Sequence, residues 1–196
     1  MSQERDKARL SDARDRFREF QEVTKPEDVV FLDEAGCNTS MARTHARSPA
    51  GERVFAKKPA AKGKNITIMG ALGADGMVAV APMLGSMTKA DFVAFLRDTL
   101  FPQMRYGQTL VMDNLRSHHS KEVAELAAHW GIHLVFVPAY SPDMNPIEHA
   151  WSKIKGILRS VAARTTKAVL SAIDAAAERV TPSDFTGWSR HCGYPF

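Results

Sequence analysis

Short apolar runs alternate with amphipathic segments along most of this chain, and their order restricts the folds open to it. Runs of branched and aromatic residues predict buried strands at 29–32, 109–112 and 132–137. Two further apolar runs, at 65–72 and 77–83, flank an Asp-Gly turn and predict a β-hairpin. Capping residues and apolar spacing predict helices over 88–100, 120–129, 145–161 and 167–179. This order predicts an α/β fold in which a mixed central sheet is flanked by helices.

The first 25 residues predict a separate, highly charged helix. Leu10, Ala13, Phe17 and Phe20 recur on one stripe, and Pro26 ends the segment. We interpret this helix as the remnant of a linker or as a contact between copies of the chain. The predicted organisation is a helix or linker remnant over 1–25, a main domain over 26–165, and a C-terminal helix and tail of the same domain over 166–196.

Composition excludes several classes of protein. No apolar run approaches the roughly 18 residues of a membrane span, and the charged N-terminus is not a secretory signal. Cys37 and Cys192 are the only cysteines, so we expect free thiols in a reducing compartment, the cytoplasm. The histidines and cysteines lack the paired spacing of a zinc site, and no glycine-rich phosphate loop is present.

Three carboxylates occupy positions where predicted elements begin or end. Asp33 follows the first apolar run, Asp113 follows the run at 109–112, and Glu148 lies in the first turn of the helix that opens with Asn145-Pro146. Thirty-four residues separate Asp113 from Glu148. Carboxylates at two strand ends and one helix start can converge on one point of a mixed sheet. Three such groups can hold two divalent cations, and two cations can cut and rejoin a phosphodiester backbone.

Each carboxylate also has an ordinary structural explanation. Asp33 can be a turn residue after a strand, with Glu34 as a competing carboxylate. Asp113-Asn114 can form a turn at a strand exit, because both side chains bond to nearby backbone. Glu148 can close a capping box on Asn145 at its own helix start. The three together, in this order and spacing, favour a shared metal site.

Lysine and arginine are concentrated in two stretches. Seven lie between Arg43 and Lys64 beside one acid, in a segment whose composition predicts a long loop or hairpin over 36–63. Five lie between His149 and Ala172, without an acid. Local positive charge beside a cation site suits a polyanionic substrate, although basic runs are also common on solvated surfaces.

The phase of the helix at 145–161 adds to this interpretation. An apolar stripe is predicted to face the sheet and comprises Ile147, Trp151, Ile154 and Leu158. Glu148, Ser152, Lys155 and Arg159 form a neighbouring stripe, so a carboxylate and two cations share one face. The predicted DNA contacts are Lys153, Lys155, Arg159, Lys58, Lys62 and Lys64.

These phrases resemble the catalytic domain of DDE transposases from bacterial insertion sequences related to the mariner superfamily. The resemblance rests on Asp113-Asn114, on the phrase from Tyr140 to Glu148 and on the 34-residue gap, and it extends from about Val29 to the closing residues 190–194. It implies a ribonuclease H-like fold whose first and fourth strands lie side by side. It also implies an enzyme that cuts DNA at transposon ends and joins 3′-hydroxyl ends to target DNA.

The resemblance implies roles for individual residues. Asp33, Asp113 and Glu148 would be the catalytic residues and the ligands of two Mg²⁺ ions, for which Mn²⁺ would substitute. The expected supporting residues around them are Asn114, His118 and Asn145. The resemblance favours His118 near the site, and the alternative is that His118 and His119 are a helix-capping or surface pair. The expected partners are transposon-end and target DNA, a second copy of the chain or a higher assembly on DNA, and an upstream helix-turn-helix domain or chain. Thirty-two residues before Asp33 are too few for such a domain, so we expect this chain to lack its own end-recognition domain.

Two other functions remain open at this stage. One is a different nuclease on the same fold, from which strand transfer of a supplied 3′-hydroxyl end would distinguish a transposase. The other is a non-enzymatic, domesticated DNA-binding module, against which the three intact carboxylates argue. The expected location is the bacterial cytoplasm, in association with the nucleoid.

Overall fold

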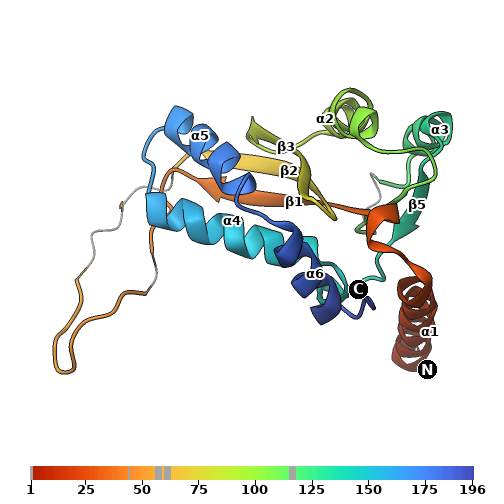
Figure 1. Cartoon of the computed structure of the whole chain (residues 1–196), viewed down its shortest axis with the longest axis horizontal. Coiled ribbons are helices and arrows are strands. Elements are labelled where there is room, and N and C mark those ends of the chain that lie inside the picture. The colour runs from red at the N-terminus through yellow and green to blue at the C-terminus, as the bar shows by residue number, and fades with distance from the viewer. Residues whose placement is uncertain (1, 44, 56–58, 60–62, 115–117) are drawn as a thin grey trace.

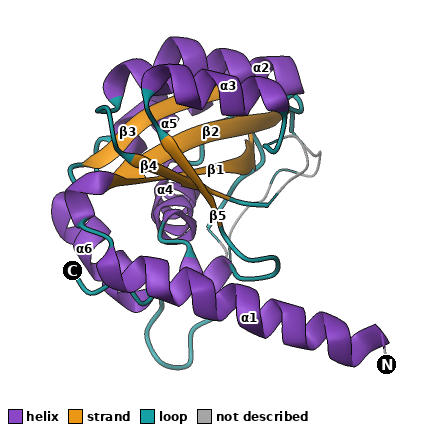
Figure 2. Cartoon of the chain, turned by 90° about the vertical axis from the view of Figure 1, so that its right-hand side faces the viewer, coloured by secondary structure: helices purple, strands orange, loops and turns teal. Residues whose placement is uncertain are grey.

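The computed structural model describes residues 2–196 except 44, 56–58, 60–62 and 115–117. A mixed five-stranded sheet has the order β3-β2-β1-β4-β5 (Figures 1 and 2). Its strands are β1 (Val29–Asn38), β2 (Asn65–Gly73), β3 (Gly76–Leu84), β4 (Thr109–Met112) and β5 (His133–Phe136). β2 is antiparallel to β1 and β3, whereas β4 is parallel to β1 and β5. The predicted mixed sheet is confirmed, with its first and fourth strands side by side.

Helices cover both faces of this sheet (Figure 2). They are α1 (Ser2–Val23), α2 (Lys89–Phe95), α3 (Lys121–Trp130), α4 (Ile147–Val161), α5 (Thr166–Ala177) and α6 (Pro182–His191). A π-helical turn, η2 (Leu96–Leu100), continues α2, and short 3-10 turns lie at η1 (Pro26–Asp28), η3 (Phe101–Gln103) and η4 (Pro142–Met144). Buried residues of α2 and α3 form one core, whereas those of α4, α5 and α6 form the other.

Side chains of β1 alternate between these two cores. Phe31 and Ala35 belong to the core with α4, whereas Val30 and Leu32 belong to the core with α2 and α3. This alternation follows from the two-residue period of a strand. Asp33 has the parity of Phe31 and Ala35, and it therefore belongs to the face that α4 covers.

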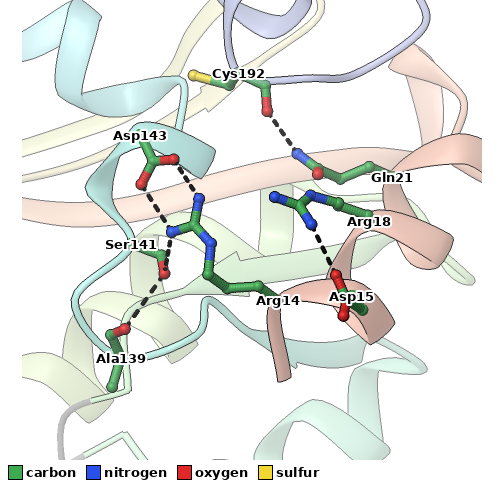
Figure 3. A network of polar contacts seen from close by, with 8 residues as sticks. All are labelled: Arg14, Asp15, Arg18, Gln21, Ala139, Ser141, Asp143 and Cys192. Carbon is green, nitrogen blue, oxygen red and sulfur yellow. Dashed lines mark hydrogen bonds and ion pairs between the residues drawn. The ribbon is translucent and has the colours of Figure 1, made fainter. Parts of the chain in front are cut away.

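The predicted apolar stripe of α4 is confirmed, because all four of its residues are buried against the sheet. Only the C-terminal half of the α1 stripe packs in the same way. Phe17 joins the core on the α4 side and Phe20 is partly buried against it, whereas Ala13 is exposed. The Nε2 amide of Gln21 donates to the carbonyl of Cys192 at 2.8 Å, which ties α1 to the C-terminal segment (Figure 3).

Two local predictions were wrong, and one helix was not predicted. β1 does not end before Asp33; it continues to Asn38 because its antiparallel pairing with β2 extends that far. Asn145 does not cap α4 with its side chain: the helix begins after Pro146, and its cap position makes no side-chain hydrogen bond. Helix α6 was not predicted, although Thr181 and Asp184 form a capping box at its start.

The described parts of the segment between β1 and β2 form a long loop that extends away from the sheet (Figure 1). At its base, the guanidinium of Arg164 donates to the carbonyls of Met41 at 2.7 Å and Thr39 at 3.2 Å. Both cysteines are buried, free thiols, as predicted. Within the described residues, no helix combines the length and the apolar character that crossing a bilayer requires.

Candidate active site

The first two carboxylates lie where β1 and β4 separate. Leu32 and Met112 are the last paired residues of these parallel strands, and Asp33 and Asp113 follow them. Asp33 stays within β1, opposite Gly70 of β2. Asp113 is the first residue after β4. Parallel pairing therefore brings two carboxylates 80 residues apart in the sequence to the same edge of the sheet.

Glu148, the third carboxylate, is the second residue of α4 and is exposed to solvent. Asp33, Asp113 and Glu148 line one open cavity of about 410 Å³, together with Asn114 and Asn145. One of its walls is the segment from Val137 to Pro142, which connects β5 to η4. The structure thus brings the three predicted carboxylates to a single cavity.

Asp33 is the most perturbed of the carboxyl groups. Its burial, together with the nearby negative charges of Glu148 and Asp113, raises its pKa to about 7. Hydrogen bonds oppose this shift: the backbone N–H of Glu34 interacts with the carboxylate, and the indole Nε1 of Trp151 donates to Oδ2 at 3.0 Å. Like charges therefore crowd one side of a partly desolvated cavity, which is the condition that a bound cation relieves.

The residues fit a hard divalent cation by their chemistry. All three charged groups are carboxylates, the ligands that Mg²⁺ and Mn²⁺ prefer. Asn145 also lines the cavity, and its buried Oδ1 has no hydrogen-bond partner among the described residues. In the part of the chain that the structure describes, no three His, Cys, Asp or Glu side chains are already close enough to enclose a metal ion.

His118 supports Asp113 from behind, as the resemblance implied. Its Nδ1 lies 2.7 Å from Oδ1 of Asp113, and its ring stacks on Phe92 of α2. Its Nε2 lies 3.8 Å from the carboxylate of Glu34. Burial lowers the pKa of His118, but the carboxylates of Asp113 and Glu34 outweigh burial and raise this pKa to about 9. A protonated His118 donates to Asp113 and holds it in place.

Asn114 and His119 form a second pair beside the cavity. His119 hydrogen-bonds to the side-chain oxygen of Asn114, and its ring stacks on Phe136 at the end of β5. Asn114 is exposed, whereas His118 and Asn145 are buried. All three of the predicted supporting residues therefore lie in or against the region of the carboxylates.

The predicted DNA contacts differ in their surroundings. Lys155 and Arg159 are partly exposed on the same helix as Glu148. Lys153 points instead to α6, where its ammonium group forms an ion pair with Asp184. Lys64 is exposed and immediately precedes β2. Two further predicted contacts, Lys58 and Lys62, lie outside the described residues.

An arginine of α1, which no sequence pattern indicated, also contacts the cavity wall. The guanidinium of Arg14 donates to Ser141 Oγ at 2.7 Å and to both carboxylate oxygens of Asp143, at 3.1 and 2.6 Å (Figure 3). Ser141 in turn donates to the carbonyl of Ala139. These contacts tie the N-terminal helix to the segment that precedes Glu148.

A mixed sheet of this order, with carboxylates at the split between its first and fourth strands and on a facing helix, defines the ribonuclease H-like class. The chain belongs to the DDE superfamily endonucleases, whose family model matches residues 28–170, well over half of its length. This match covers Asp33, Asp113 and Glu148 and confirms the resemblance to a DDE catalytic domain.

Transposases of nematode elements are similar to the chain in sequence. The Tcb1 transposase of Caenorhabditis briggsae is 28% identical over 118 residues, which cover 58% of this chain and 43% of that protein. The Tc1 transposase of Caenorhabditis elegans is 24% identical over 155 residues, which cover 74% of this chain and 57% of that protein. The chain thus spans about half the length of these relatives, and their source gives no support to a bacterial origin.

Solved structures of the Mos1 transposase share the fold. A Mos1 paired-end complex with the left transposon end has a TM-score of 0.69 at 14% identity, covering 95% of this chain and 56% of that one. The isolated catalytic domain of the Mos1 mariner transposase has a TM-score of 0.58 at 14% identity, covering 96% and 94%. The ribonuclease H-like prediction is therefore confirmed at the level of the fold.

Proposed function

We propose that this chain is the catalytic part of a DNA transposase, which cuts phosphodiester bonds at transposon ends and joins the resulting 3′-hydroxyl ends to target DNA. One observation carries the proposal: Asp33, Asp113 and Glu148, supplied by β1, the end of β4 and α4, line one cavity in a chain of the DDE family. Three convergent carboxylates serve a metal-dependent phosphoryl transfer better than they serve a binding module.

Asp33, Asp113 and Glu148 would hold two Mg²⁺ ions, with Mn²⁺ as a substitute. Mos1 structures that contain Mg and Mn support divalent metal use in this fold. When bound, the cations supply Lewis-acid stabilisation of the attacking and leaving oxygens. The three carboxylates would fix the position of these charges, and His118 supports Asp113 by donating to it. Asn145 lines the cavity wall beside them.

The DNA substrate would lie across the open cavity and along the exposed side of α4. Lys155 and Arg159 follow Glu148 on that helix, so a duplex that reaches the carboxylates can place its phosphates beside both cations. Lys64 and the basic loop that precedes it would add further phosphate contacts. One Mos1 structure of the same fold is a paired-end complex with the left transposon end, which supports action on DNA by a dimer or a larger assembly. The resemblance adds TA as the target dinucleotide and an upstream domain or chain for end recognition.

Isosteric substitutions test the catalytic assignment. Asp33→Asn, Asp113→Asn and Glu148→Gln should each reduce Mg²⁺-dependent cleavage of a transposon-end duplex at least 100-fold, because each removes a charged ligand at nearly constant volume. Circular dichroism should show an unchanged fold. A Glu148→Gln variant that cleaves normally would remove Glu148 from the site. A wild-type chain that cleaves but cannot join a supplied 3′-hydroxyl end would be a nuclease of another kind.

Salt titrations test the DNA path along α4. Lys155→Ala and Arg159→Ala should each lower the slope of log affinity against log salt by about one unit, without changing sequence preference. Lys153→Ala is the matched comparison on the same helix, since Asp184 already neutralises its ammonium group. An equal loss of slope for Lys153→Ala would mean that this ion pair opens on DNA. Unchanged slopes for Lys155→Ala and Arg159→Ala would place the DNA elsewhere.

A further inference from the structure

Trp151 lies on the same helix as Glu148 and contacts Asp33, so it connects two of the three carboxylates. It lies three residues after Glu148 in α4, so both side chains project from neighbouring positions of the helix. Its ring is buried, with 2% of its surface exposed, yet its indole Nε1 reaches Oδ2 of Asp33 at 3.0 Å. The same helix therefore presents the third carboxylate and holds the first.

The hydrogen bond has a geometric consequence for Asp33. An indole N–H is a donor only, and it makes this bond from a ring that the core prevents from turning. A donor fixed on one oxygen sets the plane of the carboxylate and the direction in which its other oxygen points. Asp33 is therefore oriented by α4 and not only by its own strand.

Gly70 makes room for this contact. It pairs directly with Asp33 across β1 and β2, and it belongs to the central part of the sheet. A Cβ atom added at Gly70 would lie 2.5 Å from the Cη2 atom and 3.2 Å from the Cζ2 atom of the Trp151 ring, and 2.9 Å from the flexible Cε end of Met77. Even an alanine at this position would displace the indole. The ring is rigid and has no flexible terminal bond whose rotation could relieve the overlap.

We infer that Trp151 is a positioning residue for metal binding: with Gly70 leaving space for its ring, it holds Asp33 in the orientation that a cation requires. This inference rests on the proposed function, because it assigns the carboxylates to a metal. It goes beyond the family's three acidic residues by adding the indole and the glycine that set the geometry of one of them. Groups that orient a metal ligand commonly change affinity by 10- to 100-fold when removed.

Binding of Mn²⁺ without DNA separates positioning from packing. Isothermal titration calorimetry should show that Trp151→Phe binds Mn²⁺ roughly 10-fold more weakly than the wild type, because phenylalanine fills much of the same space but cannot donate to Asp33. Trp130→Phe, which changes another tryptophan on α3 at the opposite face of the sheet, should leave Mn²⁺ affinity unchanged. An unchanged affinity in folded Trp151→Phe would overturn the inference and leave Trp151 a packing residue.

A pair of glycine substitutions decides the question if Trp151→Phe does not fold. Gly70→Ala should weaken Mn²⁺ binding by a similar factor, since it displaces the indole without touching the chemistry of Asp33. Gly36→Ala is the matched control, because a Cβ atom at Gly36 of β1 meets nothing within 4 Å. Equal Mn²⁺ affinity in Gly70→Ala and Gly36→Ala would overturn the inference. A wild-type chain that binds no Mn²⁺ with or without DNA would instead overturn the proposed function itself.

Discussion

Asp33 carries a conflict between burial and charge. The carboxyl group is largely removed from water and faces Glu148 and Asp113, which together raise its pKa to about 7. The ionised form is therefore unfavourable in the folded chain, although the N–H groups of Glu34 and Trp151 offset part of the penalty. Sites built for cations often have this character, because the metal later neutralises the crowded charge.

Asp33→Asn should stabilise the metal-free fold at neutral pH. A raised pKa means that ionisation opposes folding: the penalty is absent below the ordinary value of 3.8, grows as the pH rises, and is complete above about 7. The gain should be on the order of 2 kcal/mol at pH 8, below the roughly 4 kcal/mol of the full shift because water reaches the cavity. Thermal unfolding in EDTA at pH 4 and pH 8 measures it.

The added metal supplies the control for Asp33→Asn. Mg²⁺ should raise the melting temperature of the wild type, because a ligand of the folded state stabilises it, and should have little effect on the variant. A gain of equal size at pH 4 and pH 8 would show that the effect comes from packing and not from charge.

Residues whose chemical type the reaction requires can be predicted from the sequence. Residues that act through their position in the folded chain cannot. Asp33, Asp113 and Glu148 could be predicted because a cation site needs carboxylates, and because the phrases around them are specific. The contact from Trp151 to Asp33 spans 118 residues, and the one from Arg14 to Ser141 spans 127. Such contacts follow from tertiary packing, so Trp151 was predicted only as part of an apolar stripe.

At the scale of elements, the C-terminal end of α4 contains a strained residue. Its last residue, Val161, is followed by Ala162 in the left-handed conformation, with φ of 52°. An L-residue with a Cβ atom is strained there by about 1 kcal/mol, whereas glycine is not. The strain is located at the junction of α4 with α5, at the far end of the helix from Glu148.

Ala162→Gly should therefore stabilise the protein by about 0.5–1 kcal/mol, because glycine is the residue that helix ends of this conformation favour. Urea unfolding at pH 7 measures the change. Ala175→Gly, at an exposed helical position of α5, is the matched control and should destabilise by a similar amount. Losses in both variants would mean that the left-handed turn does not strain Ala162.

The elements themselves were predictable where local signals agree. The Asp-Gly turn between Gly73 and Gly76 predicted the hairpin of β2 and β3. Ser120 lies at the N-terminal cap of α3, and Gly131 lies at its C-terminal cap. The end of β1 was not predictable, because polar Asp33 and Glu34 interrupt the apolar run while pairing with β2 carries the strand on to Asn38. The cap of α4 was misread because Asn145 looks like a capping residue, but its side chain is buried at the cavity.

At the scale of the whole molecule, α1 is docked against the segment that leads into the third carboxylate. Phe17 enters the core, Gln21 reaches the C-terminal segment, and Arg14 binds Ser141 and Asp143 (Figure 3). The sequence left open whether this helix is a linker remnant or a contact between copies. The contacts of Arg14 with Ser141 and Asp143 hold α1 against the cavity wall and link the position of this helix to the loop before Glu148.

Arg14→Ala should destabilise the docked helix by about 1 kcal/mol at pH 7, since it removes two charge-assisted bonds to Asp143 and one bond to Ser141. Solvent exposure of Asp143 keeps the effect modest. Urea unfolding gives the free energy, and hydrogen exchange should show faster exchange in α1 and in the segment from Ala139 to Asp143. Both observables are needed, because local undocking of α1 can precede global unfolding.

Arg16→Ala is the matched control for this prediction. Within the described residues, Arg16 forms an ion pair with Asp12 of the same exposed helix, at 2.8 Å, and does not contact the cavity wall. It should change stability by less than about 0.5 kcal/mol. The hydrogen bond from Arg14 lowers the pKa of Asp143 below its ordinary value of 3.8. The ion pair between Arg14 and Asp143 therefore stabilises the fold above pH 4, and this stabilisation is lost as the pH falls through the lowered pKa. The difference between the two variants should therefore shrink in strong acid. Equal exchange rates around Ala139 in both variants would show that Arg14 does not hold the wall of the site.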